Sequence, residues 1–326
     1  MVATTTTAPT ANASSHSAPS RTVKTRPVRL PFDASIPKRW LADSATATHL
    51  SNGVNLLFPF GERFFVRSVR HYLEQLHAQG EDELVAQIRG FFGQEGRHAR
   101  EHERFFEILR SQGYELDDFL ARFEESFTRL EHMFPPVFRL AATAAGEHFT
   151  ALMAANAFRD REFFERAHPI MRDLMLWHAA EEIEHKAVAF DVLTRVVPNP
   201  VARYAVRTFS MAVASAFLVY WWIEGTRTLA KQDGITWKEF REDGERVQAL
   251  RRKLGIGERH IARDVFLRGI VSYLRPGFHP WDEDDSALAE AFLKDFEARR
   301  LAKTQASSGA DGADAGTSGA SEEEAS

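Results

Sequence analysis

The sequence predicts an all-α protein, on three observations. Apolar residues recur at helical spacing through the middle of the chain, and strand patterns are scarce. Prolines stand at places where the first turn of a helix would begin. The 44% hydrophobic and 27% charged fractions are those of a globular protein with an ordinary core. Long amphipathic helices packed around one core are therefore expected.

The helices can be placed from their start and stop signals. Pro59 lies near the start of the first, Gly113 follows the second, and Pro136 and Pro169 open the third and fourth. The expected long helices cover residues 55–77, 82–111, 136–159 and 169–197, with a shorter helix over 116–132. Four long helices joined by short and medium links predict a bundle.

Composition divides the rest of the chain. Residues 1–27 lack the apolar run of a secretory signal and are expected to form a disordered leader. We expect the bundle to occupy 28–200 and a C-terminal helical extension packed on it to occupy 201–302. Residues 303–326, rich in Gly, Ala, Ser and Glu, predict a disordered acidic tail.

Residues 208–223 are a run of 16 residues without a charge. A membrane-spanning helix needs about 20 apolar residues. The run therefore favours a buried helix or an oligomer contact, as in a homodimer, and leaves contact with a membrane surface as the alternative. The expected location is the cytoplasm, with membrane association as its alternative.

Composition also limits the chemistry. The chain has no cysteine, which excludes disulfides, thiolate zinc sites and Fe–S clusters. Any metal must be held by Asp, Glu or His. A net charge of −5 without a basic block argues against a nucleic acid partner.

Two copies of Glu-x-x-His stand out. Residues three apart lie on one face of a helix, so each copy can aim a carboxylate and an imidazole at one point. Each copy follows a helix that carries a Glu among small or apolar residues, 33 and 35 residues earlier. The predicted metal ligands are Glu62, Glu95, His98, Glu147, Glu182 and His185.

Charge supports a pair of metal ions at these ligands. Four buried carboxylates without partners would each cost several kcal/mol or would have to bind protons. Two divalent ions would cancel their charge. The alternative is a chance repeat of surface residues, an interpretation that suits Glu181, Glu184, Glu101 and Glu103, which are expected to face solvent or pair with Arg.

Two further histidines lie on the same helix stripes as the predicted ligands. His178 precedes Glu182 by four residues, and His102 follows His98 by four. Each is a candidate catalytic residue, as an additional ligand, an outer partner of the ligands or a proton carrier. The alternative for both is an ordinary core histidine.

The ligand pattern resembles the ferritin-like di-iron carboxylate proteins over residues 55–197. The stretches 61–65, 95–102, 178–186 and 275–280 are similar to a bacterial family labelled "predicted metal-dependent hydrolase". The resemblance implies a ferritin-like four-helix bundle with additional C-terminal helices. It also implies two divalent metal ions, with iron favoured over manganese or zinc.

Three functions remain open from the sequence. The favoured one is an O2-dependent oxidase or oxygenase that acts on a small hydrophobic substrate and takes electrons from a donor. The second is a hydrolase in which two metals activate water. The third is an iron store or ferroxidase. Five phenylalanines near the ligands either wall an apolar substrate pocket or fill the core: Phe64, Phe65, Phe91, Phe92 and Phe149.

Overall fold

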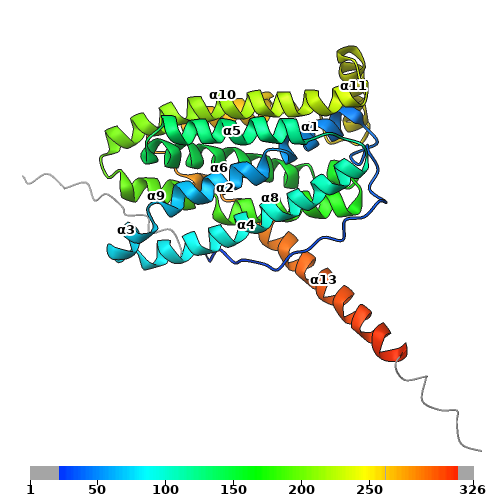
Figure 1. The fold of residues 1–326 in the computed structure, drawn as a ribbon, viewed down its shortest axis with the longest axis horizontal. Helices are drawn as coiled ribbons and strands as arrows, with labels where there is room; N and C mark the ends of the chain where they lie inside the picture. Colours follow the sequence, from blue (N-terminus) through cyan, green and yellow to red (C-terminus); the bar gives the residue numbers. More distant parts are fainter. Residues whose placement is uncertain (1–21, 261, 315–326) are drawn as a thin grey trace, which may run out of the picture.

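The computed structural model describes residues 22–260 and 262–314. Within these residues the chain forms helices α1 to α13 and no strand (Figure 1). The single β-bridge there joins Leu41 to Ala167. The all-α prediction is confirmed.

Four long helices carry the predicted ligands. They are α2 (Phe58–Arg70), α4 (Asp82–Ser111), α6 (Pro136–Arg159) and α8 (Pro169–His185). Helix α2 packs against α4 and α6, and α8 packs against α6 and α4. The bounds of α4 and α6 are those predicted, and α5 (Asp117–Met133) lies within one residue of its prediction.

Two predicted helices are divided. The range 55–77 contains the end of α1 (Ala45–Asn55), then α2, then α3 (Leu73–Ala78). Pro59 lies in the first turn of α2, where it has no N–H to continue the preceding helix. The range 169–197 divides into α8 and α9 (Val188–Val196) at a turn where Lys186 Nζ donates a hydrogen bond to the Glu283 carbonyl.

The apolar run 208–223 lies inside α10 (Pro200–Gln232), which packs along α6 and α1. Met211 and Trp221 face inward, whereas Phe209, Tyr220 and Ile223 are exposed. By length and composition α10 is the one described helix that can cross a membrane, and 28% of its most apolar stretch is buried. Contact of α10 with a membrane stays a prediction.

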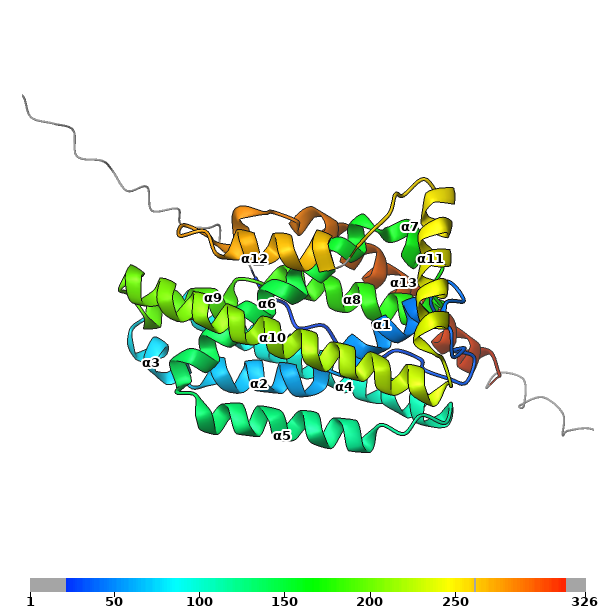
Figure 2. The same cartoon turned by 90° about the horizontal axis from the view of Figure 1, so that it is seen from above.

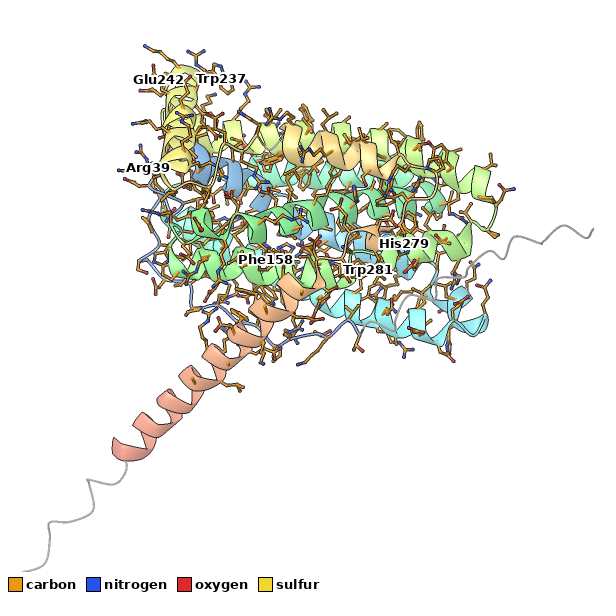
Figure 3. The ribbon with its side chains drawn as sticks, turned by 180° about the vertical axis from the view of Figure 1, so that it is seen from behind. Arg39, Phe158, Trp237, Glu242, His279 and Trp281 are labelled. Carbon is orange, nitrogen blue, oxygen red and sulfur yellow. The ribbon has the colours of Figure 1, made fainter. Side chains whose placement is uncertain are left out.

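Two of the C-terminal helices, α12 (Arg268–Tyr273) and α13 (Ser286–Asp314), pack on ligand-bearing helices, whereas α11 (Trp237–Lys253) packs on α1. Helix α11 lies across one end of the molecule, α12 contacts α6, and α13 contacts α8 (Figure 2). Figure 3 shows Trp237 and Glu242 on α11 and the projection of α13 away from the body. Residues 303–314, expected to be disordered, continue α13; residues 315–326 lie outside the described residues.

The expected disordered leader is wrong for residues 22–27. These residues run along the helices in an extended conformation, and Val23 and Arg26 are buried. Arg26 forms ion pairs with Glu184 of α8 and Glu297 of α13, which hold the segment in place. The remainder of the expected leader, residues 1–21, lies outside the described residues.

Candidate metal centre

The structure brings all six predicted ligands together in the interior. They come from the four helices α2, α4, α6 and α8, and none exposes more than 4% of its surface. Ligand atoms of these residues lie within 4.8 Å of one another in overlapping groups. Atoms that bind one ion at about 2.1 Å lie at most about 4.2 Å apart, so small side-chain movements would close each group around an ion.

Four overlapping groups are present, and two of them include His178. The other two consist of predicted ligands alone: one contains Glu62, Glu95 and His98, and the other contains Glu95, Glu147, Glu182 and His185. Glu95 belongs to both. Glu95 could therefore serve as a ligand in either group or in both.

Unpaired oxygen atoms support metal binding at this place. Both carboxylate oxygens of Glu62, Glu95 and Glu147 are buried and have no hydrogen-bond partner among the described residues. His185 Nε2 lies 3.0 Å from Glu95 Oε1 and 3.3 Å from Glu147 Oε2, without hydrogen-bond geometry. Buried carboxylates that neither water nor protein satisfies are costly. Divalent cations would supply the missing partners, so the residues fit a metal pair.

Burial and mutual repulsion shift the pKa values of the cluster. Burial, with the negative charge of Glu95 beside it, raises the pKa of Glu62 well above its usual value. Burial raises the pKa of Glu147 to about 8. Burial alone would lower the pKa of His98, but hydrogen bonds to Glu181 and Glu182 raise it to about 10. Without metal, the cluster therefore retains protons that metal binding would displace.

Each histidine ligand is oriented by a side chain from the opposite Glu-x-x-His helix. His98 Nε2 donates a 3.0 Å hydrogen bond to Glu181 of α8. His185 Nδ1 donates a 2.8 Å hydrogen bond to the side-chain carbonyl of Gln94 in α4. These bonds leave His98 Nδ1 and His185 Nε2 facing the carboxylates.

Arg26 connects the two orienting side chains. Its guanidinium donates to Glu181 at 3.1 Å and to Glu184 at 2.6 and 2.8 Å. Glu184 in turn accepts a 2.7 Å hydrogen bond from Gln94. One cation thus supports both histidine ligands from outside the metal centre.

These outer residues were not among the predicted site residues. Glu181 pairs with Arg, as expected, but it is wholly buried instead of solvent-facing. A signal was present, because a polar residue that can accept a hydrogen bond, Gln94 or Glu181, stands directly before the Glu of each Glu-x-x-His copy. No local pattern pointed to Arg26.

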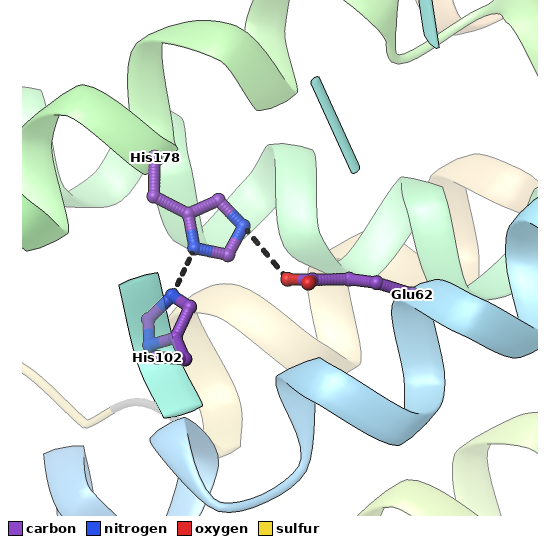
Figure 4. Close-up of side chains that lie close together, drawn as sticks. All are labelled: Glu62, His102 and His178. Carbon is purple, nitrogen blue, oxygen red and sulfur yellow. Dashed lines mark hydrogen bonds and ion pairs between the residues drawn. The ribbon is translucent and has the colours of Figure 1, made fainter. Parts of the chain in front are cut away.

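His178 and His102 form a hydrogen-bonded pair beside the cluster (Figure 4). His178 Nε2 lies 2.9 Å from Glu182 Oε1 and 3.5 Å from Glu62 Oε1. Burial lowers the pKa of His178 to about 4 and that of His102 well below its usual value. Because the Glu182 carboxylate needs a donor, neutral His178 carries its proton on Nε2, and Nδ1 accepts from His102 Nε2 at 2.6 Å.

Two neighbouring cavities reach the cluster, and they share lining residues such as Val54 and Met153. An apolar cavity of about 110 Å³ ends at Glu62 and is lined by Phe64, Phe65 and Phe149 among others. A second pocket of about 430 Å³ reaches His178 and Glu182. The predicted phenylalanine wall is therefore present in part, whereas Phe91 packs against His185 and Phe92 lies under Arg70.

We expect the metal-free protein to become less stable as the pH is raised from 6.5 to 8. Folded Glu147 keeps its proton up to about pH 8, whereas an unfolded Glu releases it near 4.5. Folded His98 keeps its proton to about pH 10, whereas an unfolded His releases it near 6.5. Unfolding thus releases protons in this window, and higher pH favours it by at most about 1.4 kcal/mol per pH unit for each proton.

The measurement is the melting temperature of metal-free protein across this range. In Glu147→Gln, which cannot titrate, the decline should be shallower. Added divalent metal should stabilise more at pH 8 than at pH 6.5, because fewer protons remain to be displaced. A melting temperature of the metal-free protein that rises over this window would contradict the assigned protonation.

Comparisons with curated proteins and with solved structures give no match. A family model described as "predicted metal-dependent hydrolase" matches residues 24–284. The matched region contains every ligand of the candidate centre and begins just before Arg26. The chain therefore belongs to this predicted metal-dependent hydrolase family.

Proposed function

We propose that the protein is an O2-dependent oxidase or oxygenase that would hold a pair of iron ions at these Glu and His residues and act on a small hydrophobic molecule. The observation that carries this proposal is the pair of ligand groups that share Glu95, next to two neighbouring, largely apolar cavities. Ligands of mixed Glu and His suit iron, manganese or zinc. Bound as ferrous ions, the pair would supply electrons for the reduction of O2.

The residues of the chain would bind the metals, exclude water and move protons. Phenylalanines that line the smaller cavity keep the Glu62 side of the centre dry, and O2, itself apolar, can pass there. The reduction of O2 consumes protons. The neutral His178 holds one on Nε2 at 2.9 Å from Glu182, and His102 is placed to replace it.

Hydrolysis is the second candidate, and the family description favours it. Two divalent ions lower the pKa of a bound water, which can then attack an ester or a phosphate. The larger pocket would admit such a substrate to the Glu182 side of the centre, where several polar side chains line it. The oxidative and the hydrolytic function would use the same ligands. The metal that supports turnover therefore distinguishes them.

We expect ferrous protein to consume O2 and zinc protein to be inert toward it. Metal analysis of protein purified without added metal identifies the native ion. Anaerobic loading with Fe(II), followed by an oxygen electrode, measures the uptake. The control is Glu62→Gln, which removes one ligand of the first site and should slow uptake by at least about tenfold.

Tight zinc or manganese in the purified protein, with ester or phosphate hydrolysis and no O2 uptake by the iron form, would favour hydrolysis and overturn the oxidative proposal. O2 uptake that turns over only the added iron, without an organic product, would indicate an iron-storing ferroxidase. The electron donor, contact of α10 with a membrane and a homodimer stay predictions.

A further inference from the structure

The larger pocket has the size of an organic ligand site. Its volume of about 430 Å³ lies within the roughly 300–1,000 Å³ typical of such sites. It extends from His178 and Glu182 of α8, between α1 and α6, to α11 and residues 259–260. Apolar side chains, among them Phe58, Met153 and Val247, form its middle.

Two arginines, Arg251 and Arg259, line this pocket. Arg251 is paired already, because its two terminal guanidinium nitrogens donate hydrogen bonds of 2.5 and 2.8 Å to the two carboxylate oxygens of Asp160. The half-buried Arg259 side chain has no ion pair among the described residues. Arg259 is held in place all the same, because Gln248 bonds its backbone N–H at 3.1 Å and its carbonyl at 2.8 Å.

We propose that this pocket binds a monocarboxylic acid with an apolar body, whose carboxylate pairs with Arg259 and whose other end lies beside His178 and Glu182. The planar guanidinium of Arg can bind a carboxylate through two hydrogen bonds. The apolar middle of the pocket would cover the body of the molecule. One arginine without an ion pair among the described residues matches one negative charge, which favours a carboxylate over a doubly charged phosphate.

The identity of the reacting end rests on the proposed function. The carboxylate is held at Arg259, at the end of the pocket away from His178 and Glu182. Reaction would therefore occur on the distal part of the apolar body. The binding itself requires no turnover, so it can be tested whether or not the protein consumes O2.

The test is calorimetric titration of the full-length protein, kept free of O2, with octanoate and with its neutral amide, octanamide. We expect octanoate to bind about ten- to hundred-fold more tightly than octanamide, the range of a charge-assisted hydrogen-bonded pair. Arg259→Gln should remove this difference. Arg252→Gln is the matched control, because Arg252 is exposed, pairs with Glu258 and does not line the pocket.

A second variant tests the place of binding. Val247→Trp puts a large ring into the middle of the pocket and should weaken octanoate and octanamide alike. Equal affinity for the two ligands in the wild type, or octanoate binding that Arg259→Gln leaves unchanged, would overturn the proposal; the second result would place the carboxylate on the metals. Tighter binding of octyl phosphate than of octanoate would overturn the choice of a carboxylate. Absent O2 uptake with this binding pattern intact would refute the oxidative function alone.

Discussion

The Glu95→Gln variant is expected to lose both metal ions. Glu95 is the residue that both ligand groups contain, and its oxygens have no other partner among the described residues. Glutamine keeps the shape of the side chain but removes the charge and one oxygen ligand. Changes in residues that merely support a ligand cost about 10- to 100-fold in metal affinity, so loss of a shared ligand should cost more. Elemental analysis after dialysis would show well under one ion per chain.

Glu103→Gln is the matched control on the same helix. Glu103 lies two turns further along α4, is partly exposed and pairs with Arg63. This variant should keep the metal content of the wild type. The buried amide of Glu95→Gln carries no charge, so the metal-free variant should fold at least as well as the metal-free wild type. Full metal content in Glu95→Gln would refute the shared-ligand assignment.

The clustering of the six predicted ligands could be foreseen because their signal is local and repeated. Three-residue spacing places Glu95 and His98 on one helix face whatever the tertiary structure. The second copy and the two preceding glutamates then fix how many helices must meet. The structure brings these residues together, and it adds His178 and His102 on the same stripes, as expected from their four-residue spacing.

The residues that hold the ligands could not be predicted in the same way. Arg26 lies in an extended segment without periodicity, and its partners are 155 and 158 residues away. Helix breaks were missed for a similar reason. The turn after His185 contains neither Gly nor Pro, and the packing of Lys186 against the chain near Glu283 is a tertiary contact.

Cavities and exposed surfaces were the least predictable features. The sequence indicated that phenylalanines lie near the ligands, but not which of them line a space. Phe65 reaches the smaller cavity because Gly146 lacks a side chain; a Cβ there would lie 2.5 Å from the Phe65 ring. The larger pocket depends on how α11 lies across the end of the molecule, which no helical pattern encodes.

Arg26→Ala is expected to weaken both the fold and the metal centre. Among the described residues, its removal leaves the wholly buried Glu181 with a hydrogen bond from His98 and leaves Glu184 with one from Gln94. Breaking a buried ion pair by deleting one partner costs about 3–5 kcal/mol. Because both histidine ligands depend on these side chains, metal affinity should also fall by about 10- to 100-fold. Thermal unfolding of metal-free protein and competition with a chelator measure the two effects separately.

Lys24→Ala tests whether the ion pairs of Arg26, and not only the presence of residues 22–27, support the metal centre. The Lys24 side chain is exposed and forms an ion pair with Glu297, worth about 0–1 kcal/mol. Its backbone carbonyl, which the substitution keeps, accepts from Gln94 and Arg26. This variant should retain both properties. Arg26→Lys keeps the charge but cannot bond Glu181 and Glu184 with one planar group. Compared with Arg26→Ala, it should therefore restore most of the stability of the wild type but less of its metal affinity. If Arg26→Ala matched Lys24→Ala in both measurements, the metal centre would be organised by the helices alone, and residues 22–27 would only cover it.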